Sequence, residues 1–246
     1  MRNIKLTMEY DGSRYRGWQR LGKNESTNTI ENKIIEVLTK MTGEDIQLFC
    51  GSRTEVGVHA YEQVVNFKTN TALKPYEIKH YLNRYLPMDI AILDVTDMPE
   101  RFHASLNAIS RTYLYRISVG DSPSVFDHKY TYYCFGVLDL DAMKKGAEYL
   151  VGTHDFKNFS TVKRSKSTVK TLYKVEIYGD EKEVQITMQG TDFLHNMARM
   201  ISATLMEIGL KRKDPKFIEE VLKDDSTTLA CAPADAQGLF LQEIEY

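Results

Sequence analysis

The 246-residue sequence lacks the features that mark several special classes of protein. Its three cysteines, Cys50, Cys134 and Cys231, are odd in number and far apart, so they predict neither a disulfide framework nor a zinc site. The six histidines are equally scattered and show no HExxH pattern, so we expect no metal site. No apolar run approaches the length that spans a bilayer, and "MRNIKLTMEYDG" lacks the apolar block of a signal peptide. We therefore expect a cytoplasmic protein that is not held in a membrane.

The sequence also lacks an excess of positive charge. Its 32 Lys and Arg residues against 34 Asp and Glu residues give a net charge of −2, which argues against a general nucleic-acid binder. Two stretches are nevertheless free of acids: "SRYRGWQRLGK", with Arg14 and Arg16, and "FKNFSTVKRSKSTVKTLYK", with Lys163, Arg164 and Lys166. Basic side chains neutralise phosphates, and aromatic rings among them can stack on unpaired bases. Each stretch is therefore either a candidate RNA contact or an ordinary solvated loop.

Hydrophobic periodicity predicts a chain of mixed helices and strands. Strand patterns occur at "IKLTMEY", "IQLFCGS", "EQVVNFK", "RTYLYRISV", "KTLYKVEIYG", "KEVQITMQG" and "GLFLQEIEY". Helical spacing separates them in both halves, so each half follows a β-α-β-β-α-β order. This order predicts the α+β class, with two halves that have antiparallel sheets, residues 1–105 and 106–246. No linker rich in Pro or Gly separates the halves, so we expect them to pack together.

Three helices are the clearest. The first is expected from about Thr29, where Asn28 and Glu31 resemble a capping box. The second should begin at Pro75. Its expected inward side chains are Ile78, Tyr81, Leu82 and Tyr85. The third, within "FLHNMARMISATLMEIG", has the strongest helical period of the chain.

One predicted connection between strands carries a compact group of reactive side chains. "CGSRTEVGVHA" places Arg53, Glu55 and His59 where a scaffold commonly presents catalytic groups. A carboxylate can act there as a nucleophile or proton acceptor, and a neighbouring guanidinium keeps it charged and directs it. Taken alone, an Arg-Thr-Glu triplet is more typical of a solvated turn, so the interpretation depends on the rest of the chain.

Eight motifs in one order supply that context. "YDGSRYRGWQ", "SRTEVGVHA", "LNRYLP", "RFHA", "SRTYLY", "KSTVKTLY", "FLHNMARMI" and "APADAQGLFL" together resemble the tRNA pseudouridine synthase A family over essentially the whole chain. The resemblance implies two ferredoxin-like halves joined around a basic central cleft. It also implies a homodimer that holds the tRNA anticodon arm across both subunits and uses neither metal nor organic cofactor. The implied reaction is the isomerisation of uridine to pseudouridine.

The resemblance also assigns roles to individual residues. The family's catalytic aspartate falls on Glu55, in the N-terminal half. Its base-stacking tyrosine and late-helix arginine fall on Tyr113 and Arg199, in the C-terminal half. Arg53 matches the arginine that enters the RNA, and His59 matches the histidine that closes the loop. Without the family register, Tyr113 is typical of a core ring, Arg199 of a solvated helix edge, and His59 of a hydrogen-bonded loop residue.

The clearest departure from the family is at position 55, where this sequence has glutamate and the family has aspartate. One extra methylene moves the carboxylate by about 1.3–1.5 Å, a carbon–carbon bond length. A displacement of that size can slow a reaction by about 10²-fold. Neighbouring differences at Val56, Ala198 and Met200 fit either a pocket rebuilt around glutamate or a site that has drifted. Two hypotheses therefore remain: an active synthase, or a weakened or inactive paralogue that acts on tRNA or rRNA by binding.

Overall fold

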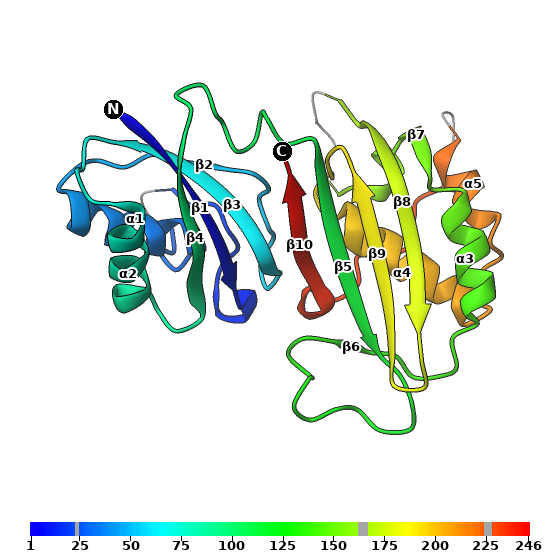
Figure 1. The fold of residues 1–246 in the computed structure, drawn as a ribbon. Coiled ribbons are helices and arrows are strands. Elements are labelled where there is room, and N and C mark those ends of the chain that lie inside the picture. Colours follow the sequence, from blue (N-terminus) through cyan, green and yellow to red (C-terminus); the bar gives the residue numbers. More distant parts are fainter. Residues whose placement is uncertain (23–24, 162–166, 224–227) are drawn as a thin grey trace. The chain divides into compact units, whose positions relative to one another are not determined.

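The computed structural model describes residues 1–22, 25–161, 167–223 and 228–246, and the chain forms two compact units (Figure 1). The N-terminal unit consists of Met1–Ile109 and Leu241–Tyr246, and the C-terminal unit consists of Ser110–Phe240. The structure thus differs from a simple division at residue 105, because the last residues return to the first unit. There the Ile109 N–H donates to the Glu245 carbonyl over 2.8 Å, and the Tyr246 hydroxyl donates to the Ala104 carbonyl over 2.8 Å.

The N-terminal unit is an antiparallel sheet covered by two helices (Figure 1). Its elements are β1 (Arg2–Tyr10), α1 (Ile30–Thr42), β2 (Leu48–Cys50), β3 (His59–Thr69), α2 (Pro75–Tyr85) and β4 (Ile90–Met98). The strands lie in the order β4-β1-β3-β2, which with this chain order is the ferredoxin-like arrangement. Alternate residues of β1, namely Ile4, Leu6 and Met8, are fully buried. The predicted α+β class and antiparallel sheet are confirmed in this unit.

The start of α1 differs in detail from the predicted capping box. Thr29, and not Asn28, is the N-cap, and its hydroxyl accepts an N–H of the first turn. Asn28 instead donates its side-chain amide to the Arg14 carbonyl over 2.6 Å, and Glu31 accepts the Arg20 N–H over 2.6 Å. Both side chains therefore tie the N-terminal basic stretch to the start of the helix.

Helix α2 begins at Pro75 as predicted, but its inward face is narrower than expected. Ile78 and Leu82 are fully buried, whereas Tyr85 is 54% exposed, so the prediction that this tyrosine points inward is wrong. Tyr81 is only half-buried, and its ring centroid lies 4.5 Å from that of Tyr85. The two rings therefore contact each other at the surface of the helix.

In the C-terminal unit the strands lie in the order β5-β9-β8-β7. Its elements are β5 (Ser110–Ser118), β6 (Tyr132–Tyr133), α3 (Leu140–Glu148), β7 (Gly152–Asp155), β8 (Val169–Gly179), β9 (Glu183–Gly190), α4 (Met197–Gly209) and α5 (Phe217–Leu222). The final strand, β10 (Leu239–Glu245), begins in this unit and continues into the N-terminal one. The pairs β5–β9, β9–β8 and β8–β7 are antiparallel, whereas β6 runs parallel to β5. Short 3-10 helices occupy Gly12–Arg14, Lys157–Phe159 and Ala236–Gly238.

Helix α4 is the central helix of the C-terminal unit. The predicted apolar stripe is buried, and so are two polar residues of the same helix, Ser202 and Thr204. Their hydroxyls donate to the carbonyls of Ala198 and Met200, one turn earlier, over 2.9 and 2.8 Å. A helix buried on nearly all sides offers a fixed base for any functional group at its N-terminal end.

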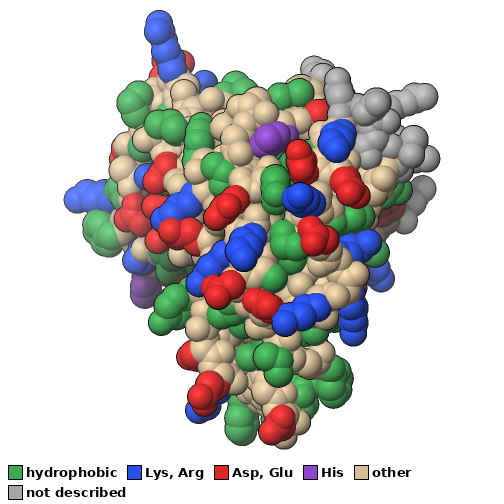
Figure 2. Space-filling view, turned by 90° about the vertical axis from the view of Figure 1, so that its right-hand side faces the viewer, with side chains coloured by type: hydrophobic (Ala, Val, Ile, Leu, Met, Phe, Trp, Pro, Cys, Tyr) green, Lys and Arg blue, Asp and Glu red, His purple; other side chains and the backbone are tan. Residues whose placement is uncertain are grey.

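The face of the C-terminal unit that carries α3 and α5 shows basic and acidic side chains interspersed (Figure 2). Lys211, for example, lies 3.3 Å from the Asp139 carboxylate. Such a surface does not have the single-sign footprint that is typical of a nucleic-acid interface. Among the described helices, none is long and apolar enough to cross a membrane.

Candidate active site

The Arg-Thr-Glu segment forms the loop between β2 and β3, as the sequence predicts. Within it Arg53 is exposed, Thr54 is buried and Glu55 is half-buried. His59 begins β3 and is only 1% exposed. Its Nδ1 accepts the Gly12 N–H over 3.1 Å and lies 3.2 Å from a carboxylate oxygen of Asp11. The histidine thus connects the loop to the "YDG" motif from the inside.

A second segment of the same motif lies directly against the loop. The Trp18 N–H donates to the Thr54 carbonyl over 3.0 Å. Gly17 has a φ of +82°, and a Cβ there would come within 3.2 Å of the backbone of Thr54, Glu55 and Val56. Only glycine satisfies both the left-handed backbone and this close approach. Two motifs that are far apart in the sequence therefore form one compact surface around Glu55.

Arg14 and Arg16, both in the first basic stretch, have different surroundings. The Arg14 guanidinium donates to the Asp89 carboxylate, with Nε 2.9 Å from Oδ2, and this bond raises the pKa of Arg14. The Tyr15 hydroxyl donates to the same carboxylate. The pKa of Tyr15 is raised above its ordinary value. Burial is the larger cause, and the hydrogen bond to Asp89 is the second. Arg16 is exposed as well, but Asp89 pairs with Arg14 and not with Arg16. Arg16 is therefore the better placed of the two to meet an external anion.

In the C-terminal unit, Tyr113 lies on β5 and is 5% exposed. Its ring meets that of Phe193 edge to face, with centroids 4.9 Å apart. Two residues further along, Tyr115 is fully buried, and its hydroxyl donates to the Asp235 carbonyl over 2.9 Å. Burial raises the pKa of Tyr115. The strand thus carries two tyrosines on one side, each fixed by a different kind of contact.

Arg199 lies in the first turn of α4 and is half-buried. Its Nε donates to the Ala234 carbonyl over 2.6 Å, and its Nη1 donates to the Asn196 side-chain oxygen over 3.0 Å. Asn196 in turn donates its amide to the Thr161 hydroxyl over 2.8 Å. These contacts fix the plane of the guanidinium, so Arg199 is an oriented cation and not a solvated helix edge.

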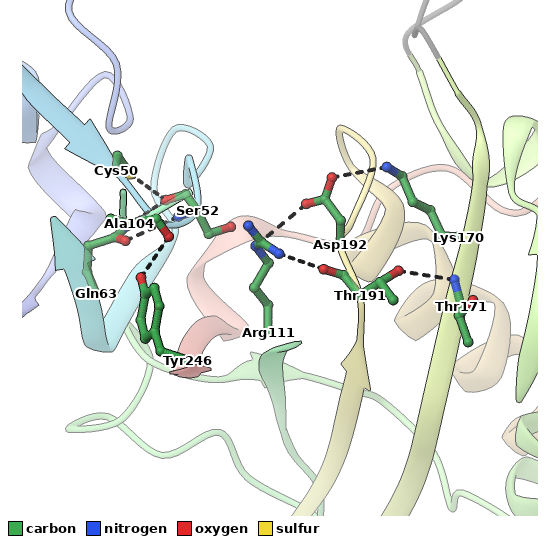
Figure 3. Close-up of polar contacts among 10 residues, drawn as sticks. All are labelled: Cys50, Ser52, Gln63, Ala104, Arg111, Lys170, Thr171, Thr191, Asp192 and Tyr246. Atoms are coloured by element: carbon green, nitrogen blue, oxygen red, sulfur yellow. Dashed lines mark hydrogen bonds and ion pairs between the residues drawn. The ribbon is translucent and has the colours of Figure 1, made fainter. Parts of the chain in front are cut away.

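The second basic stretch is only partly described, since Lys163, Arg164 and Lys166 lie outside the described residues. Lys170 lies 3.0 Å from Asp192, and Lys174 lies 2.8 Å from Glu176. Asp192 also lies 3.7 Å from the Nε of Arg111, whose Nη1 donates to the Thr191 carbonyl (Figure 3). Acids from outside the stretch thus pair with its described lysines.

The structure also adds residues that the sequence analysis did not single out. They are Tyr10, Thr54 and Gln63 around the loop, and Phe193, Asn196 and Ala234 around Tyr113 and Arg199. All of them except Gln63 stand inside quoted motifs: Tyr10 in "YDGSRYRGWQ", Thr54 in "SRTEVGVHA", Phe193 and Asn196 in "FLHNMARMI", and Ala234 in "APADAQGLFL". Membership in a motif could therefore have pointed to these residues from the sequence alone. Their contacts could be identified only from the folded structure.

Comparison with known proteins defines the class. The model of a family described as tRNA pseudouridine synthase matches residues 6–106 and 147–246. The chain belongs to this family, so it is an isomerase of the pseudouridine synthase class, and the predicted family and enzyme class are confirmed.

The particular relatives are bacterial proteins named tRNA pseudouridine synthase A. A Bacillus cereus protein with this name and the number 2 is 42% identical over 100% of both chains. Proteins from Bacillus sp. strain KSM-64 and from Clostridium tetani are also 42% identical over the full length of both chains. Among solved structures, one match is a chain of a Cbf5-Nop10-Gar1 complex. The matched region includes 83% of the present chain and 44% of the chain in the complex, with 8% sequence identity and a TM-score of 0.36.

Proposed function

We propose that this protein isomerises uridine to pseudouridine in the anticodon arm of tRNA, and that Glu55 is its catalytic carboxylate. The observation that carries the proposal is the Arg-Thr-Glu loop, which holds a half-buried Glu55 against the backbone of Gly17 in a chain of this family. In the reaction the C1′–N1 bond breaks, the uracil turns, and a C5–C1′ bond forms. C5 then loses its proton and N1 gains one, so no other reactant is needed.

Each proposed residue has chemistry that suits one step. An ionised Glu55 can act on the sugar as a nucleophile or on the base as a proton acceptor. Arg199, with its guanidinium held by the Ala234 carbonyl, is proposed to supply a fixed positive charge to the bound substrate. The Tyr113 ring, which is 5% exposed and packs edge to face on Phe193, is the proposed wall for a base outside its stack. Arg53 is exposed and can enter the RNA, whereas buried His59 supports the loop.

RNA binding is assigned to the basic residues of both stretches. We include Arg14, Arg16, Lys163, Arg164 and Lys166, with Arg16 as the best placed of those described. We further infer a homodimer and a cytoplasmic location, because the family resemblance implies the first and the second follows from a tRNA substrate. The binding-only alternative gains no support from the relatives reported above, since all of them are named as synthases.

The proposal is tested by mapping pseudouridine in tRNA from a host strain that lacks its own members of the family. The strain receives the wild-type gene, Glu55→Ala, or Glu181→Ala as an exposed control in the other unit. We expect an anticodon-arm mark with the wild type and with Glu181→Ala, and no mark with Glu55→Ala or with the empty vector. A mark restored by Glu55→Ala would remove Glu55 from catalysis. Marks elsewhere in the RNA would overturn the assigned substrate region.

A further inference from the structure

The Arg-Thr-Glu loop is held from the inside by a pair of buried hydroxyl groups. The Tyr10 hydroxyl lies 2.7 Å from the Thr54 hydroxyl, and either can be the donor. Tyr10 is 4% exposed and Thr54 is 6% exposed, so this hydrogen bond is shielded from water. Tyr10 is the last residue of β1, and Thr54 immediately precedes Glu55. A single bond thus connects the end of a central strand to the residue beside the proposed catalytic carboxylate.

A buried glutamine extends this contact into a network. Gln63, on β3, is fully buried, and its Nε2 donates to the Ser52 carbonyl over 2.6 Å and to the Tyr10 hydroxyl over 3.3 Å. Figure 3 shows Gln63 reaching back to Ser52. The loop is therefore anchored at residues 52 and 54 by side chains of two neighbouring strands. A buried polar network whose members are paired rigidifies the segment that it holds.

The other side of the loop is fixed by backbone contacts. The Trp18 N–H bonds to the Thr54 carbonyl over 3.0 Å, and Gly17 approaches the Glu55 backbone closely. Thr54 is thus held through both its side chain and its carbonyl group. The backbone beside Glu55 has little freedom, so the direction of the carboxylate depends on where this network places Thr54.

We propose that Tyr10 is a positioning residue for Glu55, and that its hydroxyl acts through Thr54 to aim the carboxylate at the uridine. This inference rests on the function proposed above for Glu55. Tyr10 itself touches no reacting atom. Its contribution is to keep a long glutamate side chain within the narrow range of positions that the reaction tolerates, where an error of about 1 Å slows turnover by about 10²-fold.

The test measures single-turnover pseudouridine formation on tRNA transcripts, together with the Kd for the same tRNA. Tyr10→Phe and Thr54→Val each remove one hydroxyl, and Thr54→Ser retains it. Tyr246→Phe is a matched control, since it removes a tyrosine hydroxyl bonded to Ala104 in the same unit. Glu55→Ala is the reference for lost catalysis.

We expect Tyr10→Phe and Thr54→Val to lower the rate constant by roughly 10- to 10²-fold while the Kd changes by less than about twofold. Thr54→Ser and Tyr246→Phe should remain within about threefold of the wild-type rate. The double variant Tyr10→Phe/Thr54→Val should be about as slow as Tyr10→Phe alone, because Tyr10→Phe already deletes the Tyr10–Thr54 bond, together with the Gln63–Tyr10 bond.

Each other outcome overturns a particular statement. Wild-type turnover by Tyr10→Phe, with Glu55→Ala inactive, would refute the positioning role and leave the proposed function intact. Equal turnover by wild type and Glu55→Ala would refute the proposed function itself. A rate loss in Tyr10→Phe that Tyr246→Phe matches, at an equal fall in Tm, would make the effect one of general stability and overturn the inference.

Discussion

The two units hold their proposed functional side chains by different means. In the N-terminal unit, Glu55 lies on a loop that depends on side-chain hydrogen bonds, chiefly those of Tyr10 and Gln63. In the C-terminal unit, Tyr113 stands on a strand and Arg199 on a helix, and a backbone carbonyl orients the arginine. Regular elements place a side chain more accurately than a loop does, so a loop needs additional buried contacts to reach the same accuracy.

This difference indicates which substitutions should most affect the proposed activity in each unit. In the N-terminal unit, the loss of a single oxygen atom from Tyr10 or Thr54 should misplace a group that remains chemically intact. In the C-terminal unit we expect the framework to tolerate such a loss, so that the largest effect comes from changing the functional group itself.

The largest effect in the C-terminal unit is expected from Arg199→Lys. Lysine retains the positive charge but cannot donate to both the Ala234 carbonyl and the Asn196 side chain in the geometry of a guanidinium. We expect kcat/KM on tRNA to fall on the order of 10²-fold, the usual cost of removing one preorganised donor. The control is Arg212→Lys, an exposed partner of Glu207 in the same unit. Equal kinetics for the two variants would contradict the role of Arg199.

A smaller effect is expected from Tyr115→Phe, and on a different property. The change removes the part-buried hydrogen bond from the tyrosine hydroxyl to the Asp235 carbonyl, which should lower the free energy of unfolding by about 1 kcal/mol. Denaturant unfolding measures this difference. Tyr178→Phe, at a tyrosine that is 76% exposed, should change it by less than about 0.5 kcal/mol. If both variants lose the same stability, the hydroxyl of Tyr115 does not hold the strand.

The ion pair between β5 and β9 should make stability depend on pH. Arg116 donates to both carboxylate oxygens of Glu183 over 2.8 Å, and this bond lowers the pKa of Glu183. Because the pKa is lower in the folded than in the unfolded chain, the stabilisation is complete above the unfolded pKa of about 4.3 and is lost as the pH falls through the folded value. Glu183→Gln should therefore cost about 1 kcal/mol at pH 7 and progressively less in acid.

Urea unfolding at several pH values checks this prediction, with Glu176→Gln as the control. Glu176 pairs with Lys174, and both side chains are more than half exposed, so its removal should have little effect at any pH. A stability difference for Glu183→Gln that is constant over the whole pH range would show that the lowered pKa does not contribute.

The smallest effect is expected for the basic stretch of the N-terminal unit. Arg16→Ala should lower the slope of log affinity against log salt by roughly 0.7–0.9, if the arginine neutralises one phosphate. Arg14→Ala should change the slope less, because Arg14 already pairs with Asp89. The measurement is tRNA binding over a range of salt concentrations. The reverse order of effects would show that the Asp89 pair opens when RNA binds.

Much of the fold could be predicted from the sequence, because alternation and helical spacing are local properties. The strands and helices fall at the predicted segments, and the Arg-Thr-Glu loop joins two of them. The contacts that fix the site could not be predicted in this way. Tyr10 and Thr54 are 44 residues apart, and Arg199 and Ala234 are 35 apart, so only strand register and helix packing bring them together. The same limit applies to Tyr85, whose exposure depends on how much of α2 meets the sheet.

The central claim, that Glu55 carries the chemistry, is tested most directly by tritium release from tRNA transcripts labelled at C5 of uridine. The reaction removes the C5 hydrogen, so release reports each completed isomerisation. Glu55→Gln keeps nearly the same shape without the charge, and Glu55→Ala removes the group entirely. The account predicts release by the wild type and a fall on the order of 10³-fold in both variants. Release at the wild-type rate by either variant would contradict it.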